Sequence, residues 1–209
     1  MYPNFDIENK FNSNVIGIDE VGRGPLAGPV VSCAFVFYDT LFSKNDLIYI
    51  QDSKKLNNKK KRFALKKILD LKKLNRINFS LGMANVLEID KYNILEATKL
   101  SMQRAVKKLN HPPSQLIIDG NIDLNLDNNP SKSIIKGDQK SLTIAAASII
   151  AKIHRDRYMK FLSYKFPHYS WQSNAGYGTK KHIEAIYKEG ITSHHRKSFE
   201  PIKSLIHSK

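Results

Sequence analysis

The stretch GIDEVGRGPLAGPVV, residues 17–31, joins two apolar segments through a loop rich in glycine. Segments with many β-branched side chains, bounded by turn-forming residues, are typical of β-strands, so this stretch predicts a strand, an open loop and a second strand. It also places two carboxylates, Asp19 and Glu20, where the first strand ends. Adjacent residues of a regular strand face opposite sides. Both side chains therefore reach one site only if the backbone bends, which Gly22 and Gly24 make possible.

The segments around this stretch predict a mixed α/β fold. Strand-like composition covers residues 14–19, 28–38, 76–84, 115–119 and 133–138. Apolar spacing of three and four residues, with capping and stop residues, predicts helices over residues 57–73, 88–109, 141–166, 179–189 and 198–207. Strands that come mainly first and helices that come mainly later indicate helices covering a central sheet, with a smaller helical part at the C-terminus. Small residues at 145–148 predict that the third helix packs close to the sheet.

The composition is that of a globular cytosolic protein. The 209 residues are 41% hydrophobic, and a chain of this length buries enough surface to fold without a covalent staple. The single cysteine, Cys33, excludes an internal disulfide and lies in an apolar run, which predicts a buried small hydrophobe. The first residues lack the blocks of a signal peptide, and the longest nearly apolar stretches are too short to span a bilayer. We expect a cytoplasmic protein with no membrane partner.

The charge balance indicates a polyanionic partner. Lys and Arg number 34 against 19 Asp and Glu, which gives a formal net charge of +15. Such an excess attracts nucleic acid, the commonest polyanion of the cytosol. A lysine-rich solvated surface is the alternative that charge alone leaves open.

Two further acids share the context of Asp19 and Glu20. Asp119 ends the apolar run QLIID, and Asp138 ends SIIKGD. Sites in α/β sheets collect just beyond strand ends, so these acids are predicted to converge. Clustered carboxylates repel unless a cation joins them, and oxygen-only ligands suit Mg²⁺ or Mn²⁺. Beside a basic surface, such a site can hydrolyse phosphodiesters with metal ions. For each acid alone, a turn or helix-capping role is the alternative.

The glycine loop does not match a dinucleotide-binding fingerprint. Gly22, Gly24 and Gly28 have the wrong spacing, and a strand follows them instead of a helix. A nucleotide-binding oxidoreductase is therefore a poor fit. A loop without side chains allows backbone groups to approach a ligand closely, and Arg23 within it can contact phosphate.

GIDEVGRGPLAGPVV closely resembles the amino-terminal signature of the ribonuclease HII family. Six further blocks follow in the family's order: DSKKL (52–56), IDGN (118–121), KGD (136–138), AAASIIAKIHRDR (145–157), GYGT (176–179) and HHRKSF (194–199). The resemblance covers residues 14–203. It implies a ribonuclease H-like core, a mixed central sheet flanked by helices, over residues 14–166. A short head (1–13) and a helical C-terminal extension that contacts substrate (167–209) complete the chain.

The resemblance also implies an activity and its residues. The family's enzymes hydrolyse the RNA strand of RNA–DNA hybrids and nick on the 5′ side of ribonucleotides embedded in duplex DNA, leaving 3′-hydroxyl and 5′-phosphate ends. Its metal-binding, catalytic carboxylates correspond to Asp19, Glu20, Asp119 and Asp138, and the metal is Mg²⁺ or Mn²⁺. Its substrate-binding positions correspond to Gly22, Arg23, Gly24, Ser53, Lys54, Tyr177 and Arg196. The backbone of the first three reads the 2′-hydroxyl, and Tyr177 senses the RNA–DNA junction. The expected protein is a monomer that takes part in DNA replication and repair.

Several residues keep two interpretations. The sequence departs from many relatives at Ser173-Asn174-Ala175, where a His-Lys pair precedes the Gly-Tyr, which puts local phosphate contacts in doubt. Tyr169 and Trp171 either stack on nucleic acid or pack under the C-terminal segment. Residues 194–196 predict a basic turn that faces phosphate. Asp156 is explained by surface ion pairs with Lys152 or Lys160. A non-catalytic basic RNA-binding protein remains the alternative function.

Overall fold

The computed structural model describes residues 3–43, 47, 49–50, 57–124, 126 and 128–207. Its strands are β1 (Val15–Val21), β2 (Val30–Phe37), β3 (Ile77–Ala84), β4 (Gln115–Asp119) and β5 (Ser131–Ile134). Its helices are α2 (Asn58–Lys73), α3 (Val86–Leu109), α4 (Leu142–Lys165), α5 (Trp171–Asn174), α6 (Lys180–Glu189) and α7 (Ile202–His207). Short 3₁₀ turns are η1 (Glu8–Lys10), η2 (Gly137–Gln139) and η3 (Pro167–Tyr169). The strand–loop–strand expected from residues 17–31 is confirmed.

The described strands form one mixed sheet in the order β3-β2-β1-β4-β5. β1 pairs with β2, and β2 with β3, in antiparallel register. β4 lies parallel to β1 and to β5. The pairing of Ile18 with Ile118 places the ends of β1 and β4 side by side, and with them Asp19 and Asp119. The sheet topology is thus what joins acids that are 100 residues apart in the chain.

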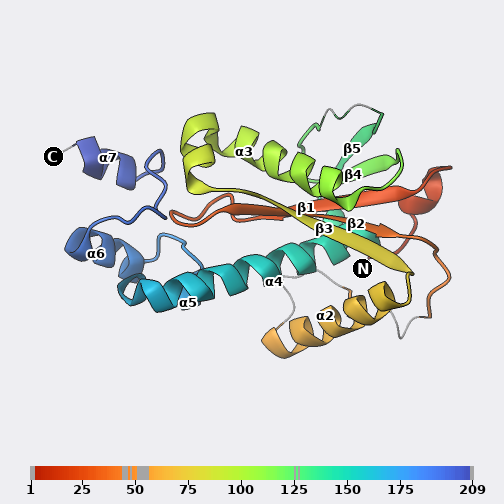
Figure 1. The fold of residues 1–209 in the computed structure, drawn as a ribbon, viewed down its shortest axis with the longest axis horizontal. Helices are drawn as coiled ribbons and strands as arrows, with labels where there is room; N and C mark the ends of the chain where they lie inside the picture. The colour runs from red at the N-terminus through yellow and green to blue at the C-terminus, as the bar shows by residue number, and fades with distance from the viewer. Residues whose placement is uncertain are drawn as a thin grey trace.

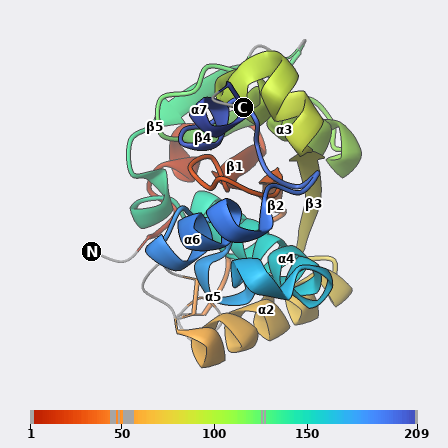
Figure 2. The same ribbon diagram turned by 90° about the vertical axis from the view of Figure 1, so that its left-hand side faces the viewer.

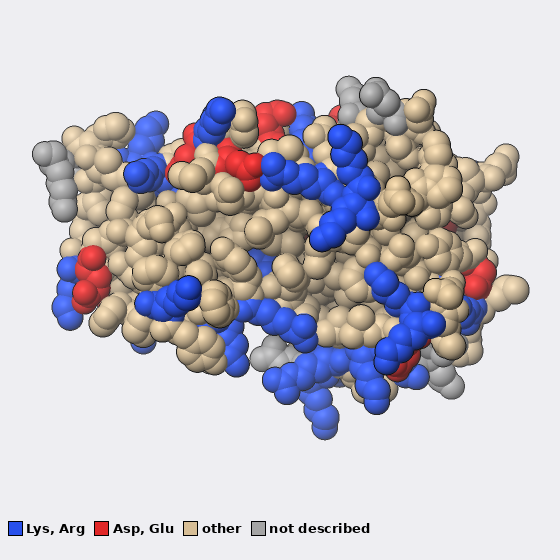
Figure 3. All heavy atoms as spheres, in the orientation of Figure 1, with Lys and Arg blue, Asp and Glu red and all other residues tan. Residues whose placement is uncertain are grey.

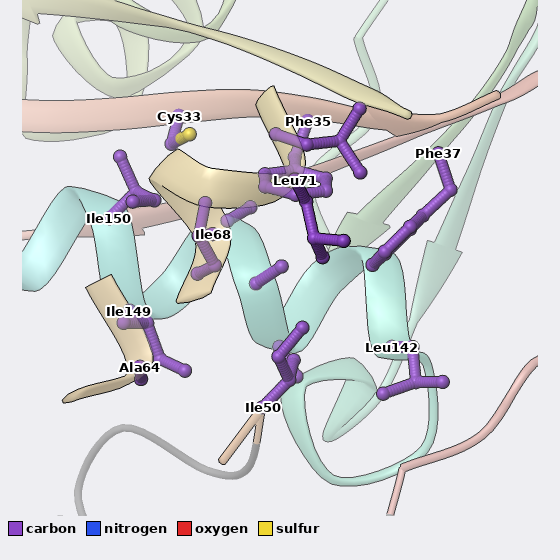
Figure 4. Packing of buried hydrophobic residues seen from close by; sticks show 14 of the residues in the cluster. Cys33, Phe35, Phe37, Ile50, Ala64, Ile68, Leu71, Leu142, Ile149 and Ile150 are labelled. Carbon is purple, nitrogen blue, oxygen red and sulfur yellow. The ribbon is translucent and has the colours of Figure 1, made fainter. Parts of the chain in front are cut away.

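Helices cover both faces of the sheet, α3 on one and α4 with α2 on the other (Figure 1). Alternate residues of β1 explain the division, since Ile16 and Ile18 pack against Met102 of α3. On the opposite face, β2 packs with α2 and α4 through residues such as Phe35 and Ile68 (Figure 4). Cys33 is fully buried in that cluster, as predicted, and burial raises the pKa of its thiol.

The amino-terminal half of α4 lies directly against β1. A Cβ atom at Gly17 would stand 2.6 Å from the backbone carbon of Thr143, so only glycine fits there. The start of α4 is fixed by a carboxylate from the head of the chain. Glu8 Oε1 accepts hydrogen bonds from Ser141 Oγ at 2.6 Å and from the Thr143 amide at 3.0 Å. A negative charge at a helix N-terminus is favourable. No such role was predicted for residues 1–13.

Three predicted elements differ from the structure. The helix expected over residues 88–109 is interrupted at Asn93, whose φ of 67° and ψ of 168° are not helical. The strand expected over residues 133–138 lies earlier, at Ser131–Ile134, and the chain then turns through Lys136 in a left-handed conformation. Asp138 therefore sits on η2 and not at a strand end. The last helix covers only Ile202–His207 of the expected 198–207, because residues before it form turns.

The chain after α4 folds back over the end of the sheet that carries the glycine loop (Figure 2). Its core is a cluster around Trp171 that includes Leu26 of that loop and Met159 of α4. Tyr169 and Trp171 are buried in this cluster, so packing is the interpretation that holds for both. Among the described residues, no helix combines the length and apolar character needed to cross a membrane.

Candidate metal and substrate site

Three carboxylates interact at one corner of the sheet: Asp19, Glu20 and Asp119. Asp138 lies on η2, which contacts β4 at this corner, and we call the four residues the acidic corner. Asp19 is 6% exposed, and its Oδ1 accepts the amide of Glu20 at 2.7 Å. Asp119 Oδ1 accepts the amide of Gly137 at 2.6 Å, and the next residue, Asp138, is 3% exposed. The contact between β4 and η2 therefore places the backbone of the fourth acid next to Asp119.

Glu20 enters the corner without the bend that was expected from the sequence. Asp19 and Glu20 pair in regular register with Cys33 and Ser32, and β1 continues to Val21. Arg23 Nη1 lies 3.5 Å from Glu20 Oε1. The other oxygen, Oε2, is buried and has no hydrogen-bond partner in the described structure. A buried carboxylate oxygen without a donor is costly unless a ligand completes it.

The electrostatics of the corner are those of like charges held together. Burial raises the pKa of Asp19 well above its usual value, and the charges of Glu20 and Asp119 raise it further. Burial is also the main cause that raises the pKa of Glu20, which Arg23 partly offsets. Bringing a cation to this corner would relieve both effects.

The residues fit a hydrated divalent cation. The described residues contain no group of three or more His, Cys, Asp or Glu side chains arranged to enclose an ion by themselves. Mg²⁺ does not require such a cage, because it retains several waters and binds through one or two carboxylates and substrate phosphates. The donors at the corner are all oxygens, and Glu20 Oε2 lacks a partner. Both features suit a hard cation.

The glycine loop (residues 22–29) leaves β1 beside this corner and turns through Gly22 and Gly28, both at positive φ. Tyr177 reaches the same loop from the C-terminal extension, 47% exposed. A Cβ atom at Gly24 would lie 3.5 Å from its ring. The structure thus places Tyr177 next to the Gly22-Arg23-Gly24 segment, as expected of residues that share one substrate site.

Arg196 occupies a different position from the phosphate-facing turn expected for residues 194–196. It is fully buried, and its guanidinium donates to backbone carbonyls of the glycine loop, including Arg23 O at 2.8 Å. A second buried arginine, Arg155 of α4, donates to Pro29 O at 3.0 Å. No function was predicted for Arg155 from the sequence. Its neighbours His154, Asp156 and Arg157 are also polar, so the local sequence carries no signal that sets Arg155 apart.

His195 is also buried, in a hydrogen-bonded chain with His182 and Trp171. Trp171 Nε1–H donates to His182 Nε2 at 2.9 Å, so His182 carries its proton on Nδ1 and donates to Tyr177 O at 2.8 Å. His195 Nδ1 accepts the Thr192 amide, which leaves its Nε2–H facing His182 Nε2 at 3.1 Å. Burial, with the neighbouring histidines, lowers the pKa of His195 to about 3. The chain is neutral and supports the backbone of Tyr177.

The departure at Ser173-Asn174-Ala175 has a structural function in this chain. The Asn174 side chain accepts the amide of Gly176 at 2.8 Å and donates to Tyr169 O at 2.7 Å. Asn174 O accepts the amide of Tyr177 at 2.9 Å. Asparagine therefore fixes the turn that presents Tyr177, in place of a charged contact.

A basic groove runs between α2 and α4 and ends near Ala175. Its volume is about 690 Å³, and the cations lining it are Lys61, Arg62, Lys152, Arg157 and Lys160. Figure 3 shows Lys and Arg gathered along the edge where Figure 1 places α2. Lys152 and Asp156 form the predicted ion pair at 2.7 Å. Ser53 and Lys54 lie outside the described residues.

Comparison with known proteins extends these observations over nearly the whole chain. The family model described as ribonuclease HII matches residues 16–202. The ribonuclease HII of Macrococcus caseolyticus is 49% identical over 203 residues, covering 96% of this chain and 72% of that protein. The ribonuclease HII of the Wolbachia of Brugia malayi is 49% identical over 202 residues, covering 96% and 95%.

Solved structures with lower identity share the fold. The ribonuclease H2 of Pyrococcus horikoshii is 23% identical with a TM-score of 0.74, covering 93% of this chain and 98% of that chain. Ribonuclease HII of Archaeoglobus fulgidus, solved in complex with PCNA, is 22% identical with a TM-score of 0.69, covering 90% and 95%. Bst-RNase HIII in complex with Mn²⁺ is 20% identical with a TM-score of 0.64, covering 93% and 70%. The family match and the half-identical relatives decide the assignment: this chain belongs to the ribonuclease HII family.

Proposed function

We propose that this protein is a metal-dependent endoribonuclease. It hydrolyses the RNA strand of RNA–DNA hybrids and nicks 5′ of ribonucleotides embedded in duplex DNA, leaving 3′-hydroxyl and 5′-phosphate ends. One observation carries the proposal: the neighbouring ends of β1 and β4 bring Asp19, Glu20 and Asp119 together beside the glycine loop, with Asp138 on the adjoining η2 turn. Membership of the ribonuclease HII family supports the same reaction.

Asp19, Glu20, Asp119 and Asp138 would hold Mg²⁺ or Mn²⁺. The metal, when bound, supplies an activated water and stabilises the leaving 3′ oxygen of an in-line displacement. The Mn²⁺ of Bst-RNase HIII is a precedent on the same fold. The protein's own contribution is to orient the scissile phosphate: the strand ends fix Asp19 and Asp119, and Gly137 N fixes the Asp119 carboxylate.

Substrate selection falls to the glycine loop and to Tyr177. Among the described residues, the amides of Arg23 and Gly24 donate to no protein acceptor and remain available to a ribose 2′-hydroxyl. Tyr177 packs against the following deoxyribose. Ser53 and Lys54 contact phosphates, and the C-terminal extension holds the duplex. The enzyme acts as a cytoplasmic monomer.

The direct test uses a duplex that carries one ribonucleotide, with the nick mapped in the presence and absence of Mg²⁺. We expect cleavage 5′ of the ribonucleotide that requires the metal, and loss of cleavage with retained binding in Asp119→Asn. Asp156→Asn is the matched control, because Asp156 is an acid on α4 that pairs with Lys152 outside the acidic corner. Metal-independent binding without a nick would instead support a non-catalytic RNA-binding protein.

A further inference from the structure

Two buried arginines lie behind the glycine loop. Arg155 of α4 and Arg196 of the C-terminal extension are both 0% exposed. Among the described residues, neither forms an ion pair with a carboxylate. Buried cations normally require a counter-charge or a full set of hydrogen bonds. Here backbone carbonyls provide that set.

Arg155 joins the two sides of the substrate site. Its Nε donates to Pro29 O at 3.0 Å and its Nη2 to Ala27 O at 3.1 Å, both in the glycine loop. Its Nη1 donates to Ala175 O at 2.9 Å, two residues before Tyr177. One rigid guanidinium therefore sets the distance between the loop and the turn that carries Tyr177.

Arg196 holds both ends of the same loop. Its Nη1 donates to Arg23 O at 2.8 Å, its Nη2 to Gly22 O at 2.5 Å, and its Nε to Gly28 O at 3.0 Å. The backbone of this residue is fixed as well, since its amide donates to Leu26 O at 2.8 Å. The first and last turns of the loop are thereby tied to one side chain.

Gly22 leaves room for one of these side chains, because a Cβ atom there would collide with Arg155 Nε. A Cβ atom at Gly28 would instead collide with Met159 Sδ, which packs beside the arginine. Together the two guanidiniums occupy six loop and turn carbonyls: Gly22, Arg23, Ala27, Gly28, Pro29 and Ala175. With the carbonyls of Gly22 and Arg23 turned to the arginines, the amides of Arg23 and Gly24 stay unpaired in the described structure.

We propose that Arg155 and Arg196 are positioning residues that fix the 2′-hydroxyl-reading loop and the Tyr177 turn in one geometry, and so determine discrimination at the RNA–DNA junction. The inference rests on the proposed function. Lysine cannot replace either residue, because only the planar fork of arginine donates in several fixed directions at once. Burial lowers the pKa of Arg155 to about 10 and that of Arg196 to about 9, which leaves both charged at neutral pH.

The test compares Arg155→Lys and Arg196→Lys with the parent protein on two substrates in Mg²⁺. One is a duplex with a single ribonucleotide, whose cleavage needs the loop and Tyr177 together; the other is a uniform RNA–DNA hybrid. A misplacement of about 1 Å can cost about 100-fold in rate. We expect kcat/KM on the single-ribonucleotide duplex to fall about 100-fold, with a smaller fall of about 10-fold on the hybrid, so that the ratio of the two changes about tenfold.

Arg104→Lys is the matched control. Arg104 also donates to a backbone carbonyl, that of Met83, at 2.8 Å, but it lies on α3 and pairs with Glu88. The control should keep the parent ratio. Guanidinium ion added to Arg196→Ala should restore part of the ratio, and this rescue identifies hydrogen bonding and not fold stability as the cause.

The outcomes separate the two proposals. Equal losses on both substrates, or an unchanged ratio in folded Lys variants, would overturn the positioning role while the proposed activity stands. If one Lys variant does not fold, the substrate ratio of the other variant tests the positioning role, because each arginine has its own hydrogen bonds to the glycine loop. Absence of any cleavage by the parent protein would overturn the proposed function itself.

Discussion

The acidic corner and the paired arginines behind the glycine loop are two buried clusters, each of like charge. They differ in how far the protein itself provides partners for the charged groups. The corner raises the pKa of Asp19 and Glu20 and leaves Glu20 Oε2 without a partner in the described structure. The arginines have their nitrogens occupied by carbonyls of the chain. The first cluster is completed only by a ligand, whereas the second is complete in the folded protein.

The difference follows from what the backbone offers. Carbonyl dipoles are abundant in a loop whose turns face inward, and they solvate a cation without any carboxylate. Few amides are free near the strand ends, because the sheet uses them for pairing. The carboxylates of a cation site and the loop that two arginines support can therefore lie within a few residues of each other in the chain.

Asp19→Asn is expected to have the largest effect on activity, and it tests the difference between the two clusters. Loss of a metal-binding charge should reduce cleavage at least about 1,000-fold, since metal stabilisation is worth several kcal/mol. Removing one of the mutually repelling charges should at the same time raise the free energy of unfolding in EDTA by about 1 kcal/mol. Urea titrations with EDTA measure the second effect. A destabilised Asp19→Asn protein would contradict the view of the corner as incomplete.

Arg196→Met should change stability in the other direction. It removes the donors to the carbonyls of Gly22, Arg23 and Gly28 and leaves them buried, at a cost of about 3 kcal/mol. Urea unfolding of the variant beside the parent protein measures the loss. A change of less than about 0.5 kcal/mol would mean that water replaces the guanidinium and that the loop is not held by it.

A third buried cluster, the His182–His195 pair, is neutral. The pH dependence of the free energy of unfolding tests this. The pKa of His195 is depressed to about 3, so the unfolded chain binds a proton below about pH 6.5 that the folded protein does not. Stability is therefore fully present above about pH 6.5 and is lost as pH falls toward about 3. We expect a loss of about 2 kcal/mol between about pH 7 and pH 5.

His195→Gln should show a smaller change of unfolding free energy over that pH range than the parent protein. His207→Gln is the control, because His207 is exposed at the end of α7. Equal pH slopes in the parent protein and His195→Gln would show that the depressed pKa of His195 does not contribute to stability.

The smallest effect is expected in the exposed cations of the groove between α2 and α4. Arg62→Gln combined with Arg157→Gln should weaken duplex binding and reduce the slope of log K against log salt by about 0.9 for each phosphate that the variant no longer neutralises. Turnover at saturating substrate should not change. Lys99→Gln with Lys107→Gln on α3, across the sheet, is the matched control. An unchanged slope would mean that the groove is only a solvated face.

The sequence was sufficient for the features that local pattern decides. The strand before Asp19, the loop through Gly22, the small residues of α4 and the cap of α6 at Thr179 follow from side-chain type and spacing, and the structure contains them. Parallel pairing of β1 and β4 then places Asp119 beside Asp19, as strand-end reasoning expects.

The features that failed depend on distant partners. Ser131–Ile134 became β5 because its backbone pairs with β4, and Asp138 lies on η2 as a result. Arg196 and His195 lie in a basic segment that local sequence assigns to the surface. Their burial is decided by carbonyls and rings that lie up to 174 residues away along the chain.

The hydrogen bonds between Glu8 and the start of α4 have a consequence for the order of assembly. Glu8 lies 133 residues before Ser141, which donates to its carboxylate, so the first turn of α4 cannot reach its final form until the chain between them has been synthesised. Closing so long a chain segment is slow compared with forming a helix. The segment around Glu8 is thus among the last to dock, and its removal would leave the central helix to start without its carboxylate.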